Sequence, residues 1–589
     1  MGIVIQLGEA SIEVHFPKLN HFWMDAGLLG LYRIAQKEQS KESDVEIILD
    51  DSGVSFKGSE KNIQSFLQKT YDRLLKEYYN TSSQNQKEKK AGFYLDTSTG
   101  QFIRFPKVKP MGIAGLVKLS GKSYKNKGVA KFKKSAPSQM KQQYPQLEEK
   151  YSQLQDRFEK FLNDTKLKTG SSLLLNGENI VHPKIYLEKI SGKTKGRCFI
   201  CGHESTSINN ISGTVFPFIT GPDGILSFNT RGSTPEKVCW KCDFIGKFVP
   251  VTGFYSVNNN TTHIYFPYSA SLGKMNDVLQ NLQASNIFYE DPKLLKNFRG
   301  TLKGFFPKPY EQFFDFLYSL YRIVMTKRKS SEEKDTNFEL DYEKLYDLTL
   351  DKTPLEFFVV ITQSLGQTQM GKMIWAFQDS VYIFRLFECL EKKGINMNGV
   401  MYLLWDPDQK NENQTIMRNR ICEKILKKQN IIALVEQQAF RIHKSEPRNS
   451  ERKNVHLLYN FVMEYEKIIR VGGNGMDQAT IDVAVSVGKS VGMSLIAYEK
   501  EKNRKGKGKG DLFRLRKTRK PEDFLNEINR IQMRYGALIN SDLYNKGQNM
   551  QEKFPEFKQF CMIAALNTYN AGIQTTQNVN SVHEQGNVS

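Results

Sequence analysis

The sequence has no long run of apolar residues. Within its 589 residues, no uninterrupted apolar stretch approaches the roughly 18 residues that a membrane-spanning helix needs. The first ten residues, MGIVIQLGEA, lack the basic start and the long apolar segment of a signal peptide. We therefore expect a cytoplasmic protein with no membrane partner.

The histidine signatures of metal-dependent hydrolases are also missing. The eight histidines include no adjacent His-Asp pair, no H-E-x-x-H and no H-x-H motif. Residues 366–372 have the spacing of a nucleotide-binding Walker A loop, but Met373 stands where a magnesium-binding Ser or Thr is required. The interval to Asp406, at the end of a Walker B-like stretch, is short. The sequence thus predicts no catalytic residues and no enzymatic activity, and helix-capping glycines account for the Walker A spacing.

Cysteine is scarce and unevenly distributed. Four of the seven cysteines form two C-x2-C pairs, Cys198 with Cys201 and Cys239 with Cys242, separated by the 37 residues from 202 to 238. Each pair can present two thiolates about 2.3 Å from one metal ion, and two pairs complete a tetrahedron. An odd cysteine count without a signal peptide favours metal binding over disulfides. We predict a zinc (Zn) site with these four ligands; an iron–sulfur cluster, redox-active thiols or a site that has lost its metal are the alternatives.

The predicted metal site is structural. Four thiolates leave no open coordination position for water, so no metal-assisted catalysis is expected there. His203 lies two residues after Cys201 but is expected at the surface, because the ligand shell is already full. The other cysteines, Cys389, Cys422 and Cys561, stand among apolar residues and are predicted to be small buried core residues.

Acidic residues are too few to balance the basic ones. Lys and Arg total 84 against 63 Asp and Glu, which gives a formal net charge of +21 and an isoelectric point near 9.3. The 39% hydrophobic residues are enough to bury cores, so disorder does not explain the charge. Such an excess indicates a polyanionic partner, of which nucleic acid is the first candidate. A generally basic proteome or a bias toward solubility is the alternative.

Residues 97–147 contain no acidic residue at all, but they carry eleven Lys and Arg, with glycines and aromatic rings between them. A block of one charge sign repels itself unless a negative partner lies beside it. We predict a duplex-contacting surface here, with Asn126 as a reader of base edges; a mobile, solvated loop is the alternative. The candidate contacts are Lys122, Lys125, Asn126, Lys127, Lys131, Lys133 and Lys134.

Residues 502–520 form a second basic cluster, with ten Lys and Arg and one acid. Alternate glycines at 506, 508 and 510 predict a loop that can follow a curved phosphate chain. We interpret it as a clamp for a nucleic-acid strand, with a solvated surface loop as the alternative. The candidate contacts are Arg504, Lys505, Lys507, Lys509, Arg514, Arg516, Lys517, Arg519 and Lys520.

Hydrophobic periodicity predicts an α+β multidomain protein. An alternating N-terminal stretch predicts strands, and the spacing of apolar residues predicts helices over residues 24–36 and 62–79. Thr353-Pro354 predicts the start of a helix, and Gly488 and Gly492 would allow two helices to approach closely. The expected domains are an α/β region at 1–330 with a zinc-ribbon insert at 189–250, a mainly helical region at 337–470, a C-terminal helical bundle at 471–575, and a disordered tail at 576–589.

Three parts of the chain together resemble a known family. They are the block Asn20-His-Phe-Trp-Met-Asp25-Ala-Gly27-Leu-Leu-Gly30-Leu, the paired C-x2-C motifs, and Gly488-Lys-Ser-Val-Gly492 followed by the basic cluster and Arg519-Lys-Pro-Glu-Asp-Phe524. In this order they resemble the CXXC–CXXC large subunits of type I CRISPR Cascade complexes, the Cas family numbered eight, and are most like its type I-B branch. The resemblance is one of layout over nearly the whole chain.

The resemblance implies a non-catalytic subunit in prokaryotic antiviral defence. It implies recognition of the short motif that flanks the target in double-stranded DNA (PAM recognition), stabilisation of the R-loop, and recruitment of the helicase-nuclease. Guide RNA and the other Cascade subunits (the backbone, guide-end and small subunits) are the implied partners. Two other interpretations remain open: a zinc-ribbon nucleic-acid enzyme, such as a nuclease or polymerase-associated factor, and an RNA-assembly protein.

Overall fold

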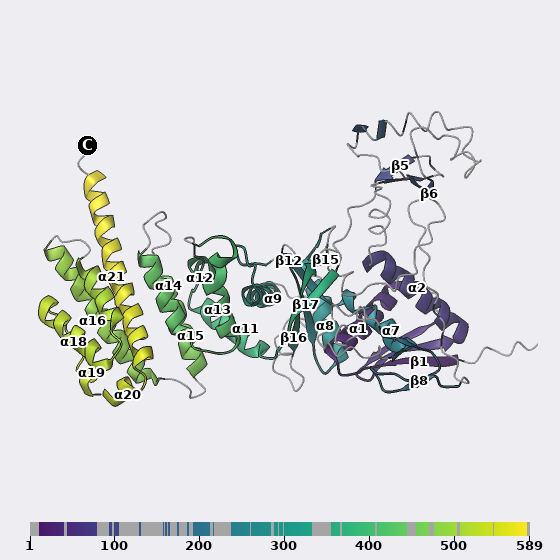
Figure 1. Cartoon of the computed structure of the whole chain (residues 1–589), viewed down its shortest axis with the longest axis horizontal. Helices are drawn as coiled ribbons and strands as arrows, with labels where there is room; N and C mark the ends of the chain where they lie inside the picture. The colour runs from purple at the N-terminus through teal and green to yellow at the C-terminus, as the bar shows by residue number, and fades with distance from the viewer. Residues whose placement is uncertain are drawn as a thin grey trace, which may run out of the picture. The chain divides into compact units, whose positions relative to one another are not determined.

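The computed structural model confirms a mixed α+β protein with a helical C-terminal region (Figure 1). The structure describes residues 11–39, 44–78, 93–96, 99, 101–104, 129–130, 157, 160–161, 163–164, 173–175, 185, 187, 193–211, 216, 237–258, 261–283, 288–291, 294–298, 300–332, 355–365, 368–406, 409–444, 455–470, 476–502, 507–545 and 547–585.

The chain divides into two compact units, and neither unit is continuous in sequence. The first contains residues 1–299 and 327–380, and the second contains residues 300–326 and 381–589. The domains expected from the sequence were continuous segments. The sequence therefore did not predict that residues 327–380 belong to the first unit.

The N-terminal part of the first unit is a three-stranded antiparallel sheet covered by helices. Its strand order is β1-β3-β2, and α1 packs against both α2 and the sheet. The elements are β1 (Ser11–Pro17), α1 (Phe22–Glu38), β2 (Glu46–Asp50), β3 (Gly53–Ser59) and α2 (Glu60–Tyr78). Both predicted helices are therefore confirmed, and the predicted apolar stripe of α2 is buried at Ile63, Phe66, Leu67, Tyr71 and Leu74.

A six-stranded sheet forms the second part of the first unit. Its strand order is β14-β15-β12-β13-β16-β17, and every neighbouring pair is antiparallel except β12 with β15. The elements are β12 (Phe254–Asn258), β13 (Thr261–Tyr268), α8 (Leu272–Gln283), β14 (Phe288–Asp291), β15 (Leu294–Phe298), β16 (Glu356–Leu365) and β17 (Thr368–Phe377). The ring of Phe22 on α1 stacks on Phe358 of β16 at 4.1 Å, which joins α1 to this sheet.

Strands β16 and β17 correct the prediction of a helix that starts at Thr353-Pro354. The apolar run from Phe357 to Ile361 is almost entirely buried, as in a strand that is covered on both faces. Such a run has neither the alternation of a half-exposed strand nor a clear helical period. The helical pattern begins only with α11, at Ser380.

Several small sheets complete the described part of the first unit. A four-stranded sheet has the order β5-β4-β7-β6, and two antiparallel pairs join β8 with β9 and β10 with β11. The elements are β4 (Phe93–Asp96), β5 (Gln101–Arg104), β6 (Val129–Ala130), β7 (Leu173–Leu175), β8 (Gly196–Arg197), β9 (Glu204–Ser205), β10 (Ile208–Asn210), β11 (Lys237–Cys239), α7 (Trp240–Gly246) and the 3-10 helix η2 (Val249–Val251).

The second unit is helical in its described residues. Helix α9 enters it through residues 309–326, and the helices after Ser380 follow in chain order. The elements are α9 (Pro309–Glu332), α11 (Ser380–Lys392), α12 (Met397–Leu403), η3 (Asn411–Thr415), α13 (Ile416–Leu426), α14 (Ile432–Lys444), α15 (Val455–Arg470), α16 (Gln478–Glu501), α17 (Lys507–Lys517), α18 (Pro521–Tyr535), α19 (Asp542–Asn545), α20 (Gly547–Glu552) and α21 (Phe554–Gln585).

Helices α16 and α21 lie side by side in the C-terminal bundle (Figure 1). A Cβ atom at Gly488 would lie 2.2 Å from the carbonyl oxygen of Cys561, and one at Gly492 would lie 2.6 Å from that of Ala565. The two glycines therefore permit a helix contact that no other residue allows, as their spacing predicted. Helix α21 continues to Gln585, so most of the tail predicted to be disordered is helical.

Helix α16 is long and apolar enough to cross a membrane by length and composition alone. Its apolar window is 61% buried in the protein, largely against α21. Asp477 caps the helix by accepting a hydrogen bond from the Thr480 amide at 2.8 Å. Burial of this kind is expected of a helix in the core of a bundle.

Candidate metal centre

The four cysteines of the two C-x2-C pairs meet at one place in the first unit. Cys198 follows strand β8, and Cys201 ends the turn after it. Cys239 ends strand β11, and Cys242 lies in the first turn of α7. The second pair thus lies at a strand-to-helix junction, and the first lies in the turn of a hairpin. We refer to residues 193–211 and 237–246 as the cysteine module.

The spacing of the sulfur atoms fits one metal ion. All four Sγ atoms lie within 4.8 Å of one another, and the Sγ atoms of Cys201 and Cys239 are 3.8 Å apart. Two ligands about 2.3 Å from a metal at tetrahedral corners are themselves about 3.8 Å apart, whereas a disulfide requires about 2.05 Å. The cysteines are therefore placed to hold a metal ion such as zinc.

Backbone hydrogen bonds hold the first pair in a tight turn. The amide of Gly202 donates to the carbonyl of Cys198 at 2.9 Å, and the Cys198 amide donates to the carbonyl of His203 at 2.8 Å. Gly202 has a φ of +73°, a left-handed conformation that glycine adopts without steric cost. The Phe199 amide donates to the Lys237 carbonyl at 2.8 Å, which ties this turn to β11.

The thiols of the cluster strongly affect each other's protonation. Hydrogen bonding with Cys201 lowers the pKa of Cys198, whereas hydrogen bonding with Cys198 raises the pKa values of Cys239 and Cys242. The cause is shared: four sulfurs this close cannot all carry a negative charge without a cation between them. A divalent metal ion would supply that charge and hold all four as thiolates.

His203 and the three remaining cysteines lie outside this cluster. His203 is exposed, and its ring shares a hydrogen bond with the Cys201 carbonyl at 2.9 Å, so it lies beside the site as expected. Cys422 and Cys561 are buried as predicted. The prediction was wrong for Cys389, which is exposed because it lies on the outer side of α11.

The cysteine module is built into the core of the first unit. The ring of Phe244 on α7 lies 6.1 Å from that of Phe16 on β1 and 5.7 Å from that of Tyr71 on α2. A Cβ atom at Gly27 would lie 2.4 Å from the Ile245 carbonyl oxygen. One turn further along α1, a Cβ atom at Gly30 would lie 2.3 Å from the Phe248 carbonyl oxygen.

Sequence reasoning placed Gly27 and Gly30 in a characteristic block but did not predict this contact. Their spacing puts both on one face of α1, as Gly488 and Gly492 are on α16, and that was the available signal. The consequence is that α1 lies directly against the backbone that follows Cys242. The metal ligands and the N-terminal block therefore form one structural element.

Asp25, in the same block, is fully buried. Its Oδ1 accepts a hydrogen bond from the Leu19 amide at 2.9 Å, which fixes the entry to α1. Burial raises the pKa of Asp25 to about 6, against the opposing effect of the Leu19 hydrogen bond. The folded protein therefore favours the protonated carboxyl, in contrast to the unfolded chain, where the pKa is near 3.8.

We expect Asp25→Asn to stabilise the protein at neutral pH. With a raised pKa, the stability that the aspartic acid contributes is present below pH 4 and is lost as the pH rises through 6. The shift of about two units corresponds to roughly 3 kcal/mol. The midpoint of thermal unfolding is measured for both proteins from pH 4 to 8. The midpoint of the variant minus that of the wild type should increase up to about pH 6 and then level off. Asp50→Asn is a control for which the opposite pH trend in stability is expected, because hydrogen bonds from Ser52 lower the pKa of Asp50.

The first group of predicted nucleic-acid contacts lies outside the described residues. This group comprises Lys122, Lys125, Asn126, Lys127, Lys131, Lys133 and Lys134, together with Arg504 and Lys505 of the second group. Their role stays a prediction.

The second basic cluster is largely helical, which corrects the predicted loop. Helix α17 spans Lys507–Lys517. The Gly508 amide donates to the Glu499 side chain at 2.6 Å, and a Cβ atom at Gly508 would lie 3.1 Å from the Cβ of Leu495. The glycine therefore allows α17 to pack closely on α16, and this tertiary contact outweighs its low helix propensity.

The cations of this cluster divide into two groups. Arg516 makes two hydrogen bonds to the carboxylate of Glu436, at 2.6 and 2.9 Å, and Arg514 pairs with Glu527 at 2.9 Å. Lys509 donates to the His443 carbonyl. The exposed cations at the end of α17 have no side-chain partner among the described residues: Lys517, Arg519 and Lys520. These three are the candidates that remain available to a ligand.

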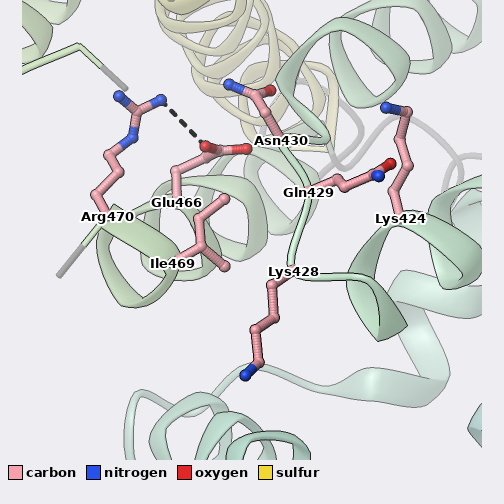
Figure 2. A pocket seen from close by; sticks show the side chains of 7 residues that line it. All are labelled: Lys424, Lys428, Gln429, Asn430, Glu466, Ile469 and Arg470. Carbon is pink, nitrogen blue, oxygen red and sulfur yellow. Dashed lines mark hydrogen bonds and ion pairs between the residues drawn. The ribbon is translucent and has the colours of Figure 1, made fainter. Parts of the chain in front are cut away.

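A cleft of about 470 Å³ opens in the second unit, where the end of α13 meets α15 (Figure 2). It is lined by Lys424, Lys428, Gln429, Asn430, Glu466, Ile469 and Arg470. Arg470 pairs with Glu466 at 3.1 Å and also with Glu556, so its charge is used within the fold. Lys424 and Lys428 point in different directions in Figure 2. We assign no ligand to this cleft.

The Walker-like stretches do not form a nucleotide site. Gly371 and Lys372 lie within strand β17, where a phosphate-binding loop would require a strand, a turn and a helix. Met401 lies on helix α12, where a Walker B acid would follow a strand. Asp406 is buried and pairs with Arg441 at 2.5 Å. Gly371 pairs with Thr362 of β16 and does not cap a helix, and Gly366 lies outside the described residues.

No known family model matches the chain, and no curated protein matches it in sequence.

Proposed function

We propose that this chain is the non-catalytic large subunit of a type I CRISPR Cascade complex, of the four-cysteine kind. The observation that carries the proposal is the packing of Gly27 and Gly30 against the backbone that follows Cys242. Two of the three sequence blocks behind the resemblance are thereby parts of one element. The third block, at Gly488 and Gly492, forms the α16–α21 contact of a helical bundle.

In this proposal the metal ion is zinc and its role is structural. Cys198, Cys201, Cys239 and Cys242 would hold it, and four thiolates provide no site for an activated water. The zinc would fix the turn after β8 and the start of α7 relative to each other. The guide RNA would then supply sequence specificity through base pairing, while the protein contacts flanking duplex and displaced strand.

The charge distribution supports a nucleic-acid partner in this role. Lys517, Arg519 and Lys520 are exposed at the end of α17 and have no ion-pair partner in the described part of the chain. Cations of this kind bind phosphates by releasing counterions, so their contribution weakens as salt rises. We propose that they hold a strand of the R-loop. The acid-free residues 97–147 remain the proposed reader of the flanking motif.

Copurification tests the proposal. The tagged protein, expressed from its own genomic neighbourhood, is expected to bring down guide RNA of uniform length and several copies of a backbone subunit. Sequencing of the bound RNA identifies repeat-derived ends. Recovery of the protein alone, together with metal-dependent cleavage of DNA or RNA by the pure protein, would favour a zinc-ribbon nucleic-acid enzyme. Recovery with ribosomal or other structured RNA would favour an RNA-assembly protein.

A further inference from the structure

A large aromatic side chain is exposed at the tip of the cysteine module. Phe199 is 51% exposed, although phenylalanine is usually buried. It lies between the two cysteines of the first pair, and its amide donates to the Lys237 carbonyl at 2.8 Å. A metal-bound turn with these hydrogen bonds is rigid, so little conformational entropy is lost when the ring meets a ligand.

Exposed cations lie close to this ring in the sequence, and one of them also lies next to it in the structure. Lys195 and Arg197 precede it by four and two residues, and both are exposed. Lys237 is its neighbour on β11. Within the described residues, no side-chain ion pair or hydrogen bond occupies these three cations. We refer to Lys195, Arg197, Lys237 and Phe199 together as the knuckle surface.

Acidic residues do little to neutralise the knuckle surface. Glu204 is the cross-strand neighbour of Arg197 in the β8–β9 pair, and it is the one acid in residues 193–211. Asp243 on α7 is already paired with Lys247 at 2.7 Å. Lys241 is also engaged, because its ammonium donates to the His15 carbonyl at 2.8 Å. Residues 193–211 and 237–246 carry five Lys and Arg against two acids. Four thiolates around a divalent metal ion would add two negative charges, so the cysteine module keeps a net charge of about +1.

We propose that the knuckle surface binds single-stranded nucleic acid by stacking an unpaired base on Phe199. An exposed ring offers every base a flat apolar face, and the adjacent cations match the phosphates on either side of it. A base inside a duplex has both faces covered by its neighbours, so the surface favours unpaired strands. The inference deepens the proposed function, on which it rests only for the source of that strand.

Variants of Phe199 test the stacking. Phe199→Trp keeps an aromatic face, whereas Phe199→Leu keeps an apolar side chain without one. Binding of the full-length protein to single-stranded DNA and RNA oligonucleotides is measured by fluorescence anisotropy. Phe199→Leu is expected to weaken binding about 5- to 150-fold, the equivalent of ~1–3 kcal/mol for one stacked base, and Phe199→Trp less than about 3-fold. The oligonucleotide that binds more tightly shows whether the preferred strand is DNA or RNA.

The cations are tested by salt dependence. Arg197→Ala and Lys237→Ala should each reduce the slope of log affinity against log salt by about 0.7, the value for one phosphate contact on a single strand. Lys427→Ala is the matched control, because Lys427 is exposed on another element and paired with Glu423 at 2.6 Å. Metal content and unfolding temperature, measured for each variant, separate lost contacts from lost folding.

The outcomes distinguish this inference from the proposed function. Equal affinity of Phe199→Leu, Phe199→Trp and wild type overturns the stacking, whether or not guide RNA copurifies. A loss restricted to Phe199→Leu supports the stacking, even if no guide RNA is found and the proposed function fails. If Phe199→Leu keeps its oligonucleotide affinity but loses a copurifying protein, the knuckle surface is a protein contact and the inference is wrong.

Discussion

Cys242→Ser is expected to remove the metal ion and to unfold the cysteine module. A structural zinc bound by thiolates is worth on the order of 10–16 kcal/mol near neutral pH, and a serine hydroxyl does not replace a thiolate. Cys242 is only 2% exposed, so water cannot reach this position in the folded module to take the place of the lost ligand. Elemental analysis of the purified protein should give one zinc per chain for the wild type and far less for the variant.

The damage should extend beyond the ligands. Helix α7 carries both Cys242 and Phe244, and Phe244 packs against Phe16 of the N-terminal sheet. Helix α1 also packs directly on α7 at Gly27. Hydrogen exchange should therefore accelerate in β1 and α1 as well as in the cysteine module. Cys389→Ser is the matched control, because that cysteine is exposed and belongs to no metal-binding group in the described chain. A wild-type protein with well under one zinc, or an unchanged Cys242→Ser variant, would contradict the expectation.

The metal site was predictable because its signal is local. Two C-x2-C pairs specify both ligand type and turn geometry within a few residues, so Cys198 and Cys242 could be assigned together despite their separation. The helices at 22–38 and 60–78 were predictable for a similar reason, since their periodicity continues over several turns. Identification of this four-cysteine cluster as a candidate metal site needed no knowledge of the fold.

Tertiary contacts account for the predictions that were wrong. Alternate glycines predicted a loop at 502–520, but Gly508 is the residue that allows α17 to approach Leu495 and Glu499. The apolar run in β16 gave no period because successive residues, which point to opposite faces of the sheet, are buried alike. In each case a tertiary contact, which local propensity does not encode, determines whether the segment forms a helix, a strand or a loop.

The strongest long-range feature was also invisible in the sequence. Glu311 on α9 and Arg418 on α13 are 107 residues apart, and both are almost completely buried as an ion pair with an N–O distance of 2.6 Å. The guanidinium also donates to the Phe305 carbonyl and lies 4.1 Å from the ring centroid of Phe306. This pair joins residues 300–326 to the helices that follow Ser380.

Arg418→Met is expected to destabilise the second unit by about 3–5 kcal/mol, the usual result of leaving one partner of a buried pair without its counter-charge. Burial already raises the pKa of Glu311, and the Arg418 charge opposes that effect. Without the arginine, the pKa of Glu311 should rise further and the carboxyl should fold in its protonated form. The loss of stability should therefore be smaller at pH 5 than at pH 8.

A double variant separates the lost ion pair from lost packing. In Glu311→Gln/Arg418→Met neither charge remains, so much of the stability should return, because replacing both partners is often close to neutral. Lys427→Met, which breaks an exposed pair on the same helix, should cost less than about 1 kcal/mol. Denaturant unfolding at pH 5 and pH 8 measures all three. If Arg418→Met loses the same free energy at both pH values, the unpaired charge of Glu311 is not the cause, and the lost contacts with Phe305 and Phe306 must be.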